Sequence, residues 1–305
     1  MAIYSIRDLE KLSGIKAHTI RVWEQRYRII QPQRTETNIR YYADDDLKLL
    51  LNVALLNKNG IKISRIANMS AQEIAEKVAA ISDLNFEYDT QLDALTISMI
   101  EMDEYKFDRI VSTNTRQIGF ERTMLEVIYP FLEKLSILWL TGSINPAQES
   151  FISYLIRQKI IAAIDQEPLT ASKDAKKFII YLPEGERQEL SLLFMQYLLK
   201  SRKNRVIYLG LDISLSDLKD ACKIHEPDYI FTMITETFAK EPVQKYIDRM
   251  GAGFPDARIL LSGYQVVVQP VSPPENVLIL KSLPQMLEFL TWTSATAAVN
   301  EEQVG

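Results

Sequence analysis

The chain of 305 residues contains one cysteine and two histidines. The single thiol, Cys222, excludes an internal disulfide and a cysteine-rich zinc site. His18 and His225 leave few groups for metal ligation or acid–base catalysis, so we expect no metal site. No run of 18 apolar residues occurs, and no membrane-spanning helix is predicted. The first residues include acids and lack the apolar core of a signal peptide, so we expect a cytoplasmic, reducing setting.

The overall composition, 47% apolar and 25% charged, is that of a soluble globular protein, and the length predicts two or three domains. Charge is unevenly distributed along the chain. Residues 1–75 hold 12 Lys/Arg against 8 Asp/Glu, a net +4, whereas the remainder has 23 against 32, a net −9. A basic N-terminal unit on an acidic chain indicates a polyanion contact confined to one end; chance variation is the alternative.

The N-terminal residues predict a pair of short helices. Ser5 and Asp8 form the pattern of a capping box, and Ser13-Gly14 ends the first helix. The second helix, about 16–27, has a packing stripe at helical spacing: Ile20, Trp23 and Tyr27. Two short helices joined by a glycine turn predict a helix-turn-helix whose second helix reads DNA.

A basic and aromatic stretch begins at the end of the second helix and continues beyond it. It contains Arg26, Arg34, Arg40 and Tyr41, with a predicted turn around Asn38 between two short extended pieces. The planar guanidinium of arginine can donate two hydrogen bonds to a phosphate, so the stretch predicts a DNA-contacting wing. A solvated basic surface without a ligand is the alternative. A capped helix over 47–58 and a short helix from 61 complete this unit.

The order of these motifs resembles the MerR family of bacterial transcription regulators. The resemblance is carried by Ser5-Ile6-Arg7-Asp8-Leu9, the run from Thr19 to Arg26, Pro32-Gln33-Arg34-Thr35, and Arg40-Tyr41-Tyr42 before an Asp-capped helix. Asn38 stands where the family usually has glycine at the wing tip. The resemblance implies the following DNA-binding residues: His18, Thr19, Arg21, Arg26, Arg34, Asn38, Arg40 and Tyr41. Two roles stay open for His18, which are contact with a base and capping of its own helix.

The rest of the chain predicts a helix bundle and then a sheet. Residues 76–167 form helical patterns, the longest over about 120–140, which indicate an antiparallel bundle. Residues 174–295 alternate short β-rich runs with helical patterns, and 296–305 is a tail. The predicted strands are Phe178–Leu182, Val206–Leu209, Tyr229–Ile234, Ile259–Ser262 and Val277–Leu280. The fold class is therefore multidomain α and α/β, ending in a doubly wound parallel five-stranded sheet.

A bundle followed by such a sheet resembles the cobalamin-binding module of light-responsive carotenoid-gene repressors. The spacing of that module's motifs is kept, and the matching positions are Trp139, Glu149, Glu186, Gln188, Thr232 and Gly263. Gln188 replaces the cobalt-ligating histidine, and an amide is a poorer metal donor than an imidazole. We therefore predict that light-sensitive cobalamin binding is lost, while cobalamin bound without a protein ligand to cobalt stays open. Trp139 either caps a planar ligand or is a buried aromatic.

No convincing catalytic constellation is present, because the sheet region has no GxGxxG, P-loop or nucleophile elbow. Glu184, Glu186 and Glu189 are expected to be solvated in an exposed loop, and Cys222 to be an inert core thiol. The predicted function is that of a transcriptional regulator, a repressor, which binds double-stranded DNA sequence-specifically as a homo-oligomer and has a C-terminal sensor or oligomerisation module. The alternatives are a small-molecule or protein-interaction sensor with secondary DNA contact, and then a corrinoid-linked transferase.

Overall fold

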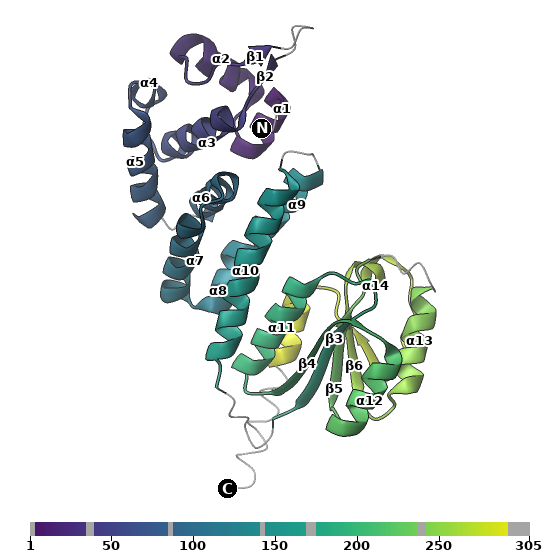
Figure 1. The fold of residues 1–305 in the computed structure, drawn as a ribbon. Coiled ribbons are helices and arrows are strands. Elements are labelled where there is room, and N and C mark those ends of the chain that lie inside the picture. Colours follow the sequence, from purple (N-terminus) through teal and green to yellow (C-terminus); the bar gives the residue numbers. More distant parts are fainter. Residues whose placement is uncertain are drawn as a thin grey trace. The chain divides into compact units, whose positions relative to one another are not determined.

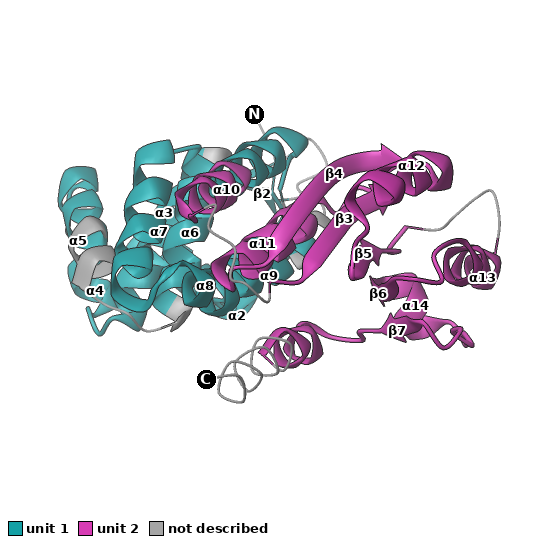
Figure 2. Ribbon diagram, turned by 90° about the horizontal axis from the view of Figure 1, so that it is seen from below, with its two compact units in different colours: residues 1–156 teal, residues 157–305 magenta. Residues whose placement is uncertain are grey.

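The computed structural model describes residues 4–34, 40–84, 88–140, 144–168, 175–236 and 242–291. The chain divides into two compact units, Met1–Ile156 and Arg157–Gly305 (Figure 2). The boundary falls within the helix α10 (Pro146–Gln166). Among the described residues, no helix is both long and apolar enough to cross a membrane.

Unit 1 begins with the predicted helix pair, α1 (Ile6–Ser13) and α2 (Ala17–Tyr27). The Ser5 side chain accepts from the Asp8 N–H while Asp8 Oδ2 accepts from the Ser5 N–H at 2.8 Å, so the predicted capping box is present. Gly14 ends α1 at φ 70°, a left-handed conformation that glycine adopts without steric cost. The turn is fixed further by Glu10, whose carboxylate accepts from the Ala17 N–H at 3.2 Å.

The wing is a two-stranded antiparallel ribbon of β1 (Gln33–Arg34) and β2 (Arg40–Tyr41). It is continued by a backbone bridge between Tyr4 and Tyr42, which joins the start of the chain to the end of the wing. The predicted wing turn, Asn38 included, lies outside the described residues.

Three helices follow the wing: α3 (Asp44–Lys58), α4 (Ile63–Ile66) and α5 (Ala71–Leu84). The third helix begins three residues before the predicted start, because the Ala43 N–H donates to Asp46 Oδ2 at 2.9 Å and the intervening acids fall inside the first turn. These helices share a fully buried apolar core with α1 and α2, which includes Leu9, Leu12, Ile20, Leu47 and Leu50.

The remaining helices of unit 1 pack around α6 (Tyr88–Glu101), which contacts α3, α5, α7 and α9. They are α7 (Glu104–Ile118), α8 (Phe120–Thr123), the π-helical turn η1 (Met124–Ile128), α9 (Tyr129–Leu140) and the start of α10. Asp93 of α6 is buried and accepts from Lys58 Nζ of α3 at 2.6 Å and from Lys134 Nζ of α9 at 3.1 Å. One carboxylate thus joins the N-terminal helices to the bundle.

The helix predicted over about 120–140 is present, and it contains the π-helical turn η1. Pro130 is the physical reason: it has no N–H to donate and its ring crowds the carbonyl four residues earlier. The chain widens to a π turn there, and the Tyr129 N–H donates to the Met124 carbonyl.

Unit 2 contains the predicted five-stranded parallel sheet. Its strands are β3 (Lys177–Pro183), β4 (Arg205–Ile213), β5 (Tyr229–Met233), β6 (Arg258–Ser262) and β7 (Val277–Ile279). The order is β4-β3-β5-β6-β7, and every neighbouring pair is parallel. Strands buried on both faces, such as β3, read as continuous apolar runs, which is why they were predictable.

The connecting helices are α11 (Glu189–Ser201), α12 (Leu215–His225), α13 (Val243–Gly253) and α14 (Tyr264–Val268), and residues 283–291 are also helical. Helix α11 and residues 283–291 cover one face of the sheet, and α12 and α13 cover the other (Figures 1 and 2). Alternate residues of β3 point to the two faces: Phe178 stacks on Tyr229, whereas Tyr181 packs in the core below α13.

Candidate functional site

The outer surface of α2 carries the side chains predicted to read DNA. His18, Arg21 and Arg26 are exposed and Thr19 is half-buried, while Ile20 and Trp23 are buried against the core. The His18 Nε2 atom lies 3.2 Å from the Thr19 hydroxyl. The Arg26 guanidinium lies 5.9 Å from the ring centroid of Tyr27. The helix therefore presents a polar and cationic surface on a fixed apolar base.

The wing places two arginines opposite each other. Arg34 of β1 pairs directly with Arg40 of β2. Like charges in directly opposite positions destabilise a ribbon unless an anion lies close by. The Nε atom of Arg40 is buried and has no hydrogen-bond partner among the described residues. Tyr41 donates its hydroxyl to Gln33 Oε1 at 2.7 Å, which orders the same end of the wing.

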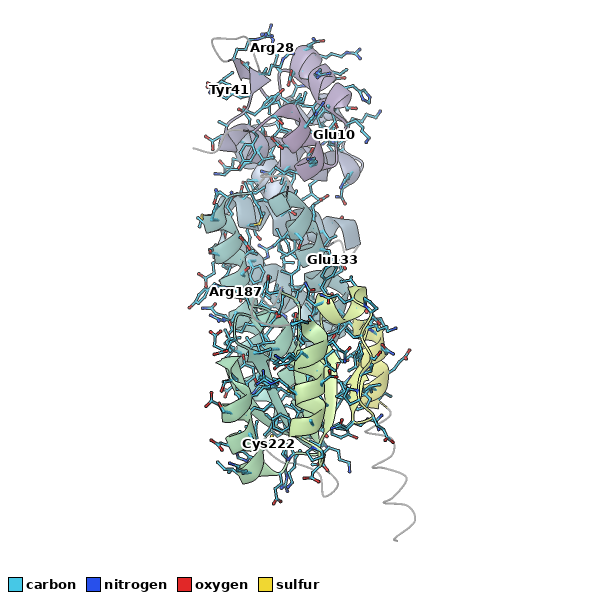
Figure 3. All side chains as sticks on the ribbon, turned by 90° about the vertical axis from the view of Figure 1, so that its right-hand side faces the viewer. Glu10, Arg28, Tyr41, Glu133, Arg187 and Cys222 are labelled. Carbon is cyan, nitrogen blue, oxygen red and sulfur yellow. The ribbon has the colours of Figure 1, made fainter. Side chains whose placement is uncertain are left out.

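The wing and α2 lie at one end of unit 1. Figure 3 shows Arg28, the residue that ends α2, at the same end as Tyr41 of β2. Arg28 is exposed and has a left-handed backbone, at φ 53°. A cationic helix beside a cationic ribbon is the arrangement that proteins use to contact base edges and phosphates together.

A buried hydrogen bond that the sequence did not predict joins α2 to the wing. The Tyr42 hydroxyl donates to Glu24 Oε1, and both side chains are buried. Burial, followed by the neighbouring Glu24 carboxylate, raises the pKa of the Tyr42 hydroxyl well above its usual range. One signal was available: Glu24 follows Ile20 by four residues, which places an acid on the packing side of an otherwise basic helix.

In unit 2, the candidate site is the carboxyl edge of the sheet, where strands β3 and β5 end. The loop after β3 contains Glu186, which is only 2% exposed. Its Oε1 atom accepts from the backbone N–H of Thr235 at 2.8 Å and of Glu236 at 3.0 Å. Burial raises the pKa of the Glu186 carboxyl, an effect that these two hydrogen bonds partly offset. The expectation that the loop carboxylates are all solvated is therefore wrong for Glu186, because the loop turns this side chain inward toward β5.

Gln188, at the predicted ligand position, is the N-cap residue of α11 and is half-buried. Its side chain makes no capping hydrogen bond. Thr232 is fully buried within β5. Glu186, Gln188, Thr232 and Gly263 thus all lie on β5 or in segments that border the strand ends of one sheet.

Gly263 has a packing role that is independent of any ligand. Its φ is 109°, and a Cβ atom there would lie 2.4 Å from the Ile234 carbonyl oxygen. The backbones of the two segments are joined by hydrogen bonds from the Ile234 N–H to the Ser262 carbonyl and from the Gln265 N–H to the Ile234 carbonyl. Ser262 turns its hydroxyl to the Leu280 carbonyl at 2.9 Å.

The other two predicted cofactor positions belong to unit 1. Glu149 lies in the first turn of α10 and is half-buried. Trp139 lies in α9, and its side chain is outside the described part of the structure. The roles assigned to both residues stay predictions.

The residues at the sheet edge do not fit a cobalamin whose cobalt is ligated by the protein. The only side chain at the ligand position is the Gln188 amide, a weak donor to cobalt. Glu186, two positions before Gln188, already accepts hydrogen bonds from two backbone N–H groups of the loop after β5.

Within the described ranges, no group of three or more His, Cys, Asp or Glu side chains could hold a metal ion. Cys222 is half-buried, and burial raises the pKa of its thiol to about 11, so it stays protonated near neutral pH. It lies at the opposite end of unit 2 from Arg187, which belongs to the loop after β3 (Figure 3).

Comparison with known proteins finds two family matches, both within the first 163 residues. Residues 4–73 match the family described as MerR HTH family regulatory protein, and residues 91–163 match the B12 binding domain. The HTH-type transcriptional repressor CarH of Myxococcus xanthus is 24% identical over 259 residues, which is 83% of this chain and 85% of CarH. CarA of the same organism, also an HTH-type transcriptional repressor, is 25% identical over 288 residues, 91% of this chain and 90% of CarA.

A shorter similarity covers only the N-terminal part. The HTH-type transcriptional regulator MlrA of Escherichia coli (strain K12) is 30% identical over 73 residues, 24% of this chain and 30% of MlrA. The chain therefore combines a MerR-type helix-turn-helix domain with a B12-binding domain, and it is homologous over most of its length to the repressors CarH and CarA.

Proposed function

We propose that this protein is a transcriptional repressor that binds double-stranded operator DNA through α2 and the wing. The observation that carries the proposal is the wing ribbon, in which Arg34 faces Arg40 and the Arg40 Nε atom is buried without a hydrogen-bond partner among the described residues. A DNA phosphate that lies against the ribbon would accept charge-assisted hydrogen bonds from these guanidinium groups. The similarity to two transcriptional repressors over most of the chain supports the same function.

In this mechanism, α2 enters the major groove with His18, Thr19 and Arg21 toward the base edges. Arg26 and the wing residues Arg34, Arg40 and Tyr41 contact the flanking backbone. Phosphate contacts fix the register of the helix, and base contacts supply the sequence preference. One such unit reads a single half-site, so the protein binds as a homodimer or higher oligomer on paired half-sites.

The C-terminal module controls assembly or orientation of the DNA-binding units. Within unit 1, Asp93 connects the bundle to the DNA-binding helices, because its carboxylate pairs with both Lys58 at the end of α3 and Lys134 of the bundle. A change in the packing of the bundle would alter these two ion pairs and could thereby shift α3, which packs against the DNA-binding helices.

The test is titration of the protein onto DNA from its own upstream region at several salt concentrations. We expect Arg40→Ala to weaken binding to specific and non-specific DNA alike and to lower the slope of log affinity against log salt by about one unit. The matched control is Lys219→Ala, which removes an exposed cation of α12 in unit 2. An unchanged salt slope in Arg40→Ala, or an equal loss in the control, would contradict the wing assignment.

A further inference from the structure

The strand order of unit 2 places a topological switch point between β3 and β5. The chain leaves β3 toward α11 on one face and leaves β5 toward α13 on the other (Figure 2). Adjacent strands whose connections diverge in this way leave a crevice between their carboxyl ends, and doubly wound sheets bind ligands in that crevice. Here it lies between the loops at 184–188 and 234–236.

Glu186 occupies this crevice from within the chain. Gly185, at φ 88°, makes the turn that directs the next residue inward, and the Glu186 N–H closes the turn on the Pro183 carbonyl at 3.1 Å. On the other side, the Gly185 N–H donates to Asp212 Oδ1 at 3.0 Å, which anchors the loop to the end of β4. The loop is thus held in the conformation that buries the carboxylate.

One oxygen of the Glu186 carboxylate, Oε1, accepts both hydrogen bonds. The donors are two successive backbone N–H groups, those of Thr235 and Glu236. Consecutive N–H groups that converge on one point form a binding site for an anionic or strongly accepting ligand atom. Charge-assisted hydrogen bonds of this kind are about twice as strong as neutral ones. The donors that a phosphate or carbonyl would need at the switch point are already used.

We propose that Glu186 is an internal ligand that closes the switch-point crevice, so that unit 2 is complete without cobalamin or any other acceptor ligand bound there. A ligand that needs these amides must displace Glu186 and deprive its carboxylate of both hydrogen bonds. This inference concerns unit 2 alone and holds or fails independently of DNA binding.

Amide hydrogen exchange in the full-length protein tests directly whether Glu186 acts as an internal ligand. In the wild type, we expect the Thr235 and Glu236 amides to exchange slowly. In Glu186→Ala, their exchange should accelerate by about tenfold or more, while the β5 amides of Ile230 and Phe231 stay protected and show that the sheet is intact. The control is Glu184→Ala, an exposed carboxylate of the same loop. Equal exchange of the two amides in the wild type and in Glu186→Ala would overturn the proposal.

Chemical rescue separates an internal ligand from a merely structural residue. Acetate supplies the carboxylate that Glu186→Ala lacks, so we expect acetate to restore slow exchange at residues 235 and 236 in this variant. Wild type and Glu184→Ala should not respond. If the amides become exposed in Glu186→Ala but acetate does not protect them, the site does not bind carboxylates and the proposal fails.

A second measurement uses adenosylcobalamin and hydroxocobalamin as probes, followed by visible absorption. For the wild type, we expect no saturable spectral change at concentrations that would fill a micromolar site. Saturable binding of either probe would contradict the proposal that unit 2 is complete without cobalamin. If the Thr235 and Glu236 amides also stayed protected from exchange, the binding would not have displaced Glu186, which would contradict its role as an internal ligand. Neither readout involves DNA, so a failure here is distinguishable from a failure of the repressor assignment.

Discussion

Substitution of Tyr42 by phenylalanine tests how α2 is held against the wing. The change removes only the hydroxyl that donates to Glu24 Oε1, and it leaves a carboxylate that is 9% exposed without this donor. A hydrogen bond to a charged group contributes about 1.5–3 kcal/mol, and a buried group left unsatisfied costs a similar amount. We expect the free energy of unfolding of unit 1 to fall by that amount.

For a unit of this size, each kcal/mol lowers the melting temperature by about 2–4 °C, so Tyr42→Phe should melt about 3–12 °C below the wild type. Circular dichroism during heating measures this shift. The matched control is Tyr41→Phe, which removes a hydroxyl from a half-buried neighbour that bonds to a neutral amide, Gln33. Its effect on the melting temperature should be smaller.

The same substitution separates positioning from contact with DNA. Tyr42 is fully buried, so it donates nothing to a phosphate. If it fixes α2 relative to the wing, Tyr42→Phe should weaken operator binding and leave the salt slope of binding unchanged, in contrast to Arg40→Ala. Glu24→Gln keeps an acceptor oxygen and should lose less affinity. A Tyr42→Phe protein that melts at the wild-type temperature and binds the operator with wild-type affinity would refute the reasoning.

Three further outcomes follow from unit 2. Gly263→Ala should destabilise it strongly, with a lower midpoint of urea unfolding, because the new Cβ would lie 2.4 Å from the Ile234 carbonyl oxygen at a φ of 109°; a wild-type midpoint would refute this close approach. Burial raises the pKa of Glu186, so ionising this carboxyl costs more free energy in the folded than in the unfolded protein; the stability of wild type relative to Glu186→Gln should therefore be highest below the usual value of 4.5 and should fall as pH rises through the folded value, and a pH-independent difference would count against the raised pKa. The Cys222 thiol should react slowly with a disulfide reagent near neutral pH and faster as pH approaches about 11, whereas rapid reaction at neutral pH would contradict its burial.

The predictions that the structure bears out depend on residues that are close in the sequence. The Ser5 and Asp8 capping box, the glycine turn after α1 and the apolar side of α2 all involve separations of three to seven residues, where helix geometry leaves few alternatives. The alternation of apolar strands with helical segments likewise predicted the five-stranded parallel sheet, because parallel strands require crossover connections.

Only the tertiary structure decided which polar side chains became buried. Glu24 meets Tyr42 across 18 residues, and Glu186 meets Thr235 across 49, so no local pattern could show that either acid leaves water. The burial of Glu186 depends on which strands are neighbours and on the turn at Gly185, and both are properties of the assembled sheet. The sequence by itself determined three features: a helix pair of the DNA-binding type, a helix bundle and a doubly wound sheet. The fold determined that Tyr42 bonds to Glu24 of α2 and that Glu186 bonds to the backbone after β5, because both contacts exist only after distant segments have packed together.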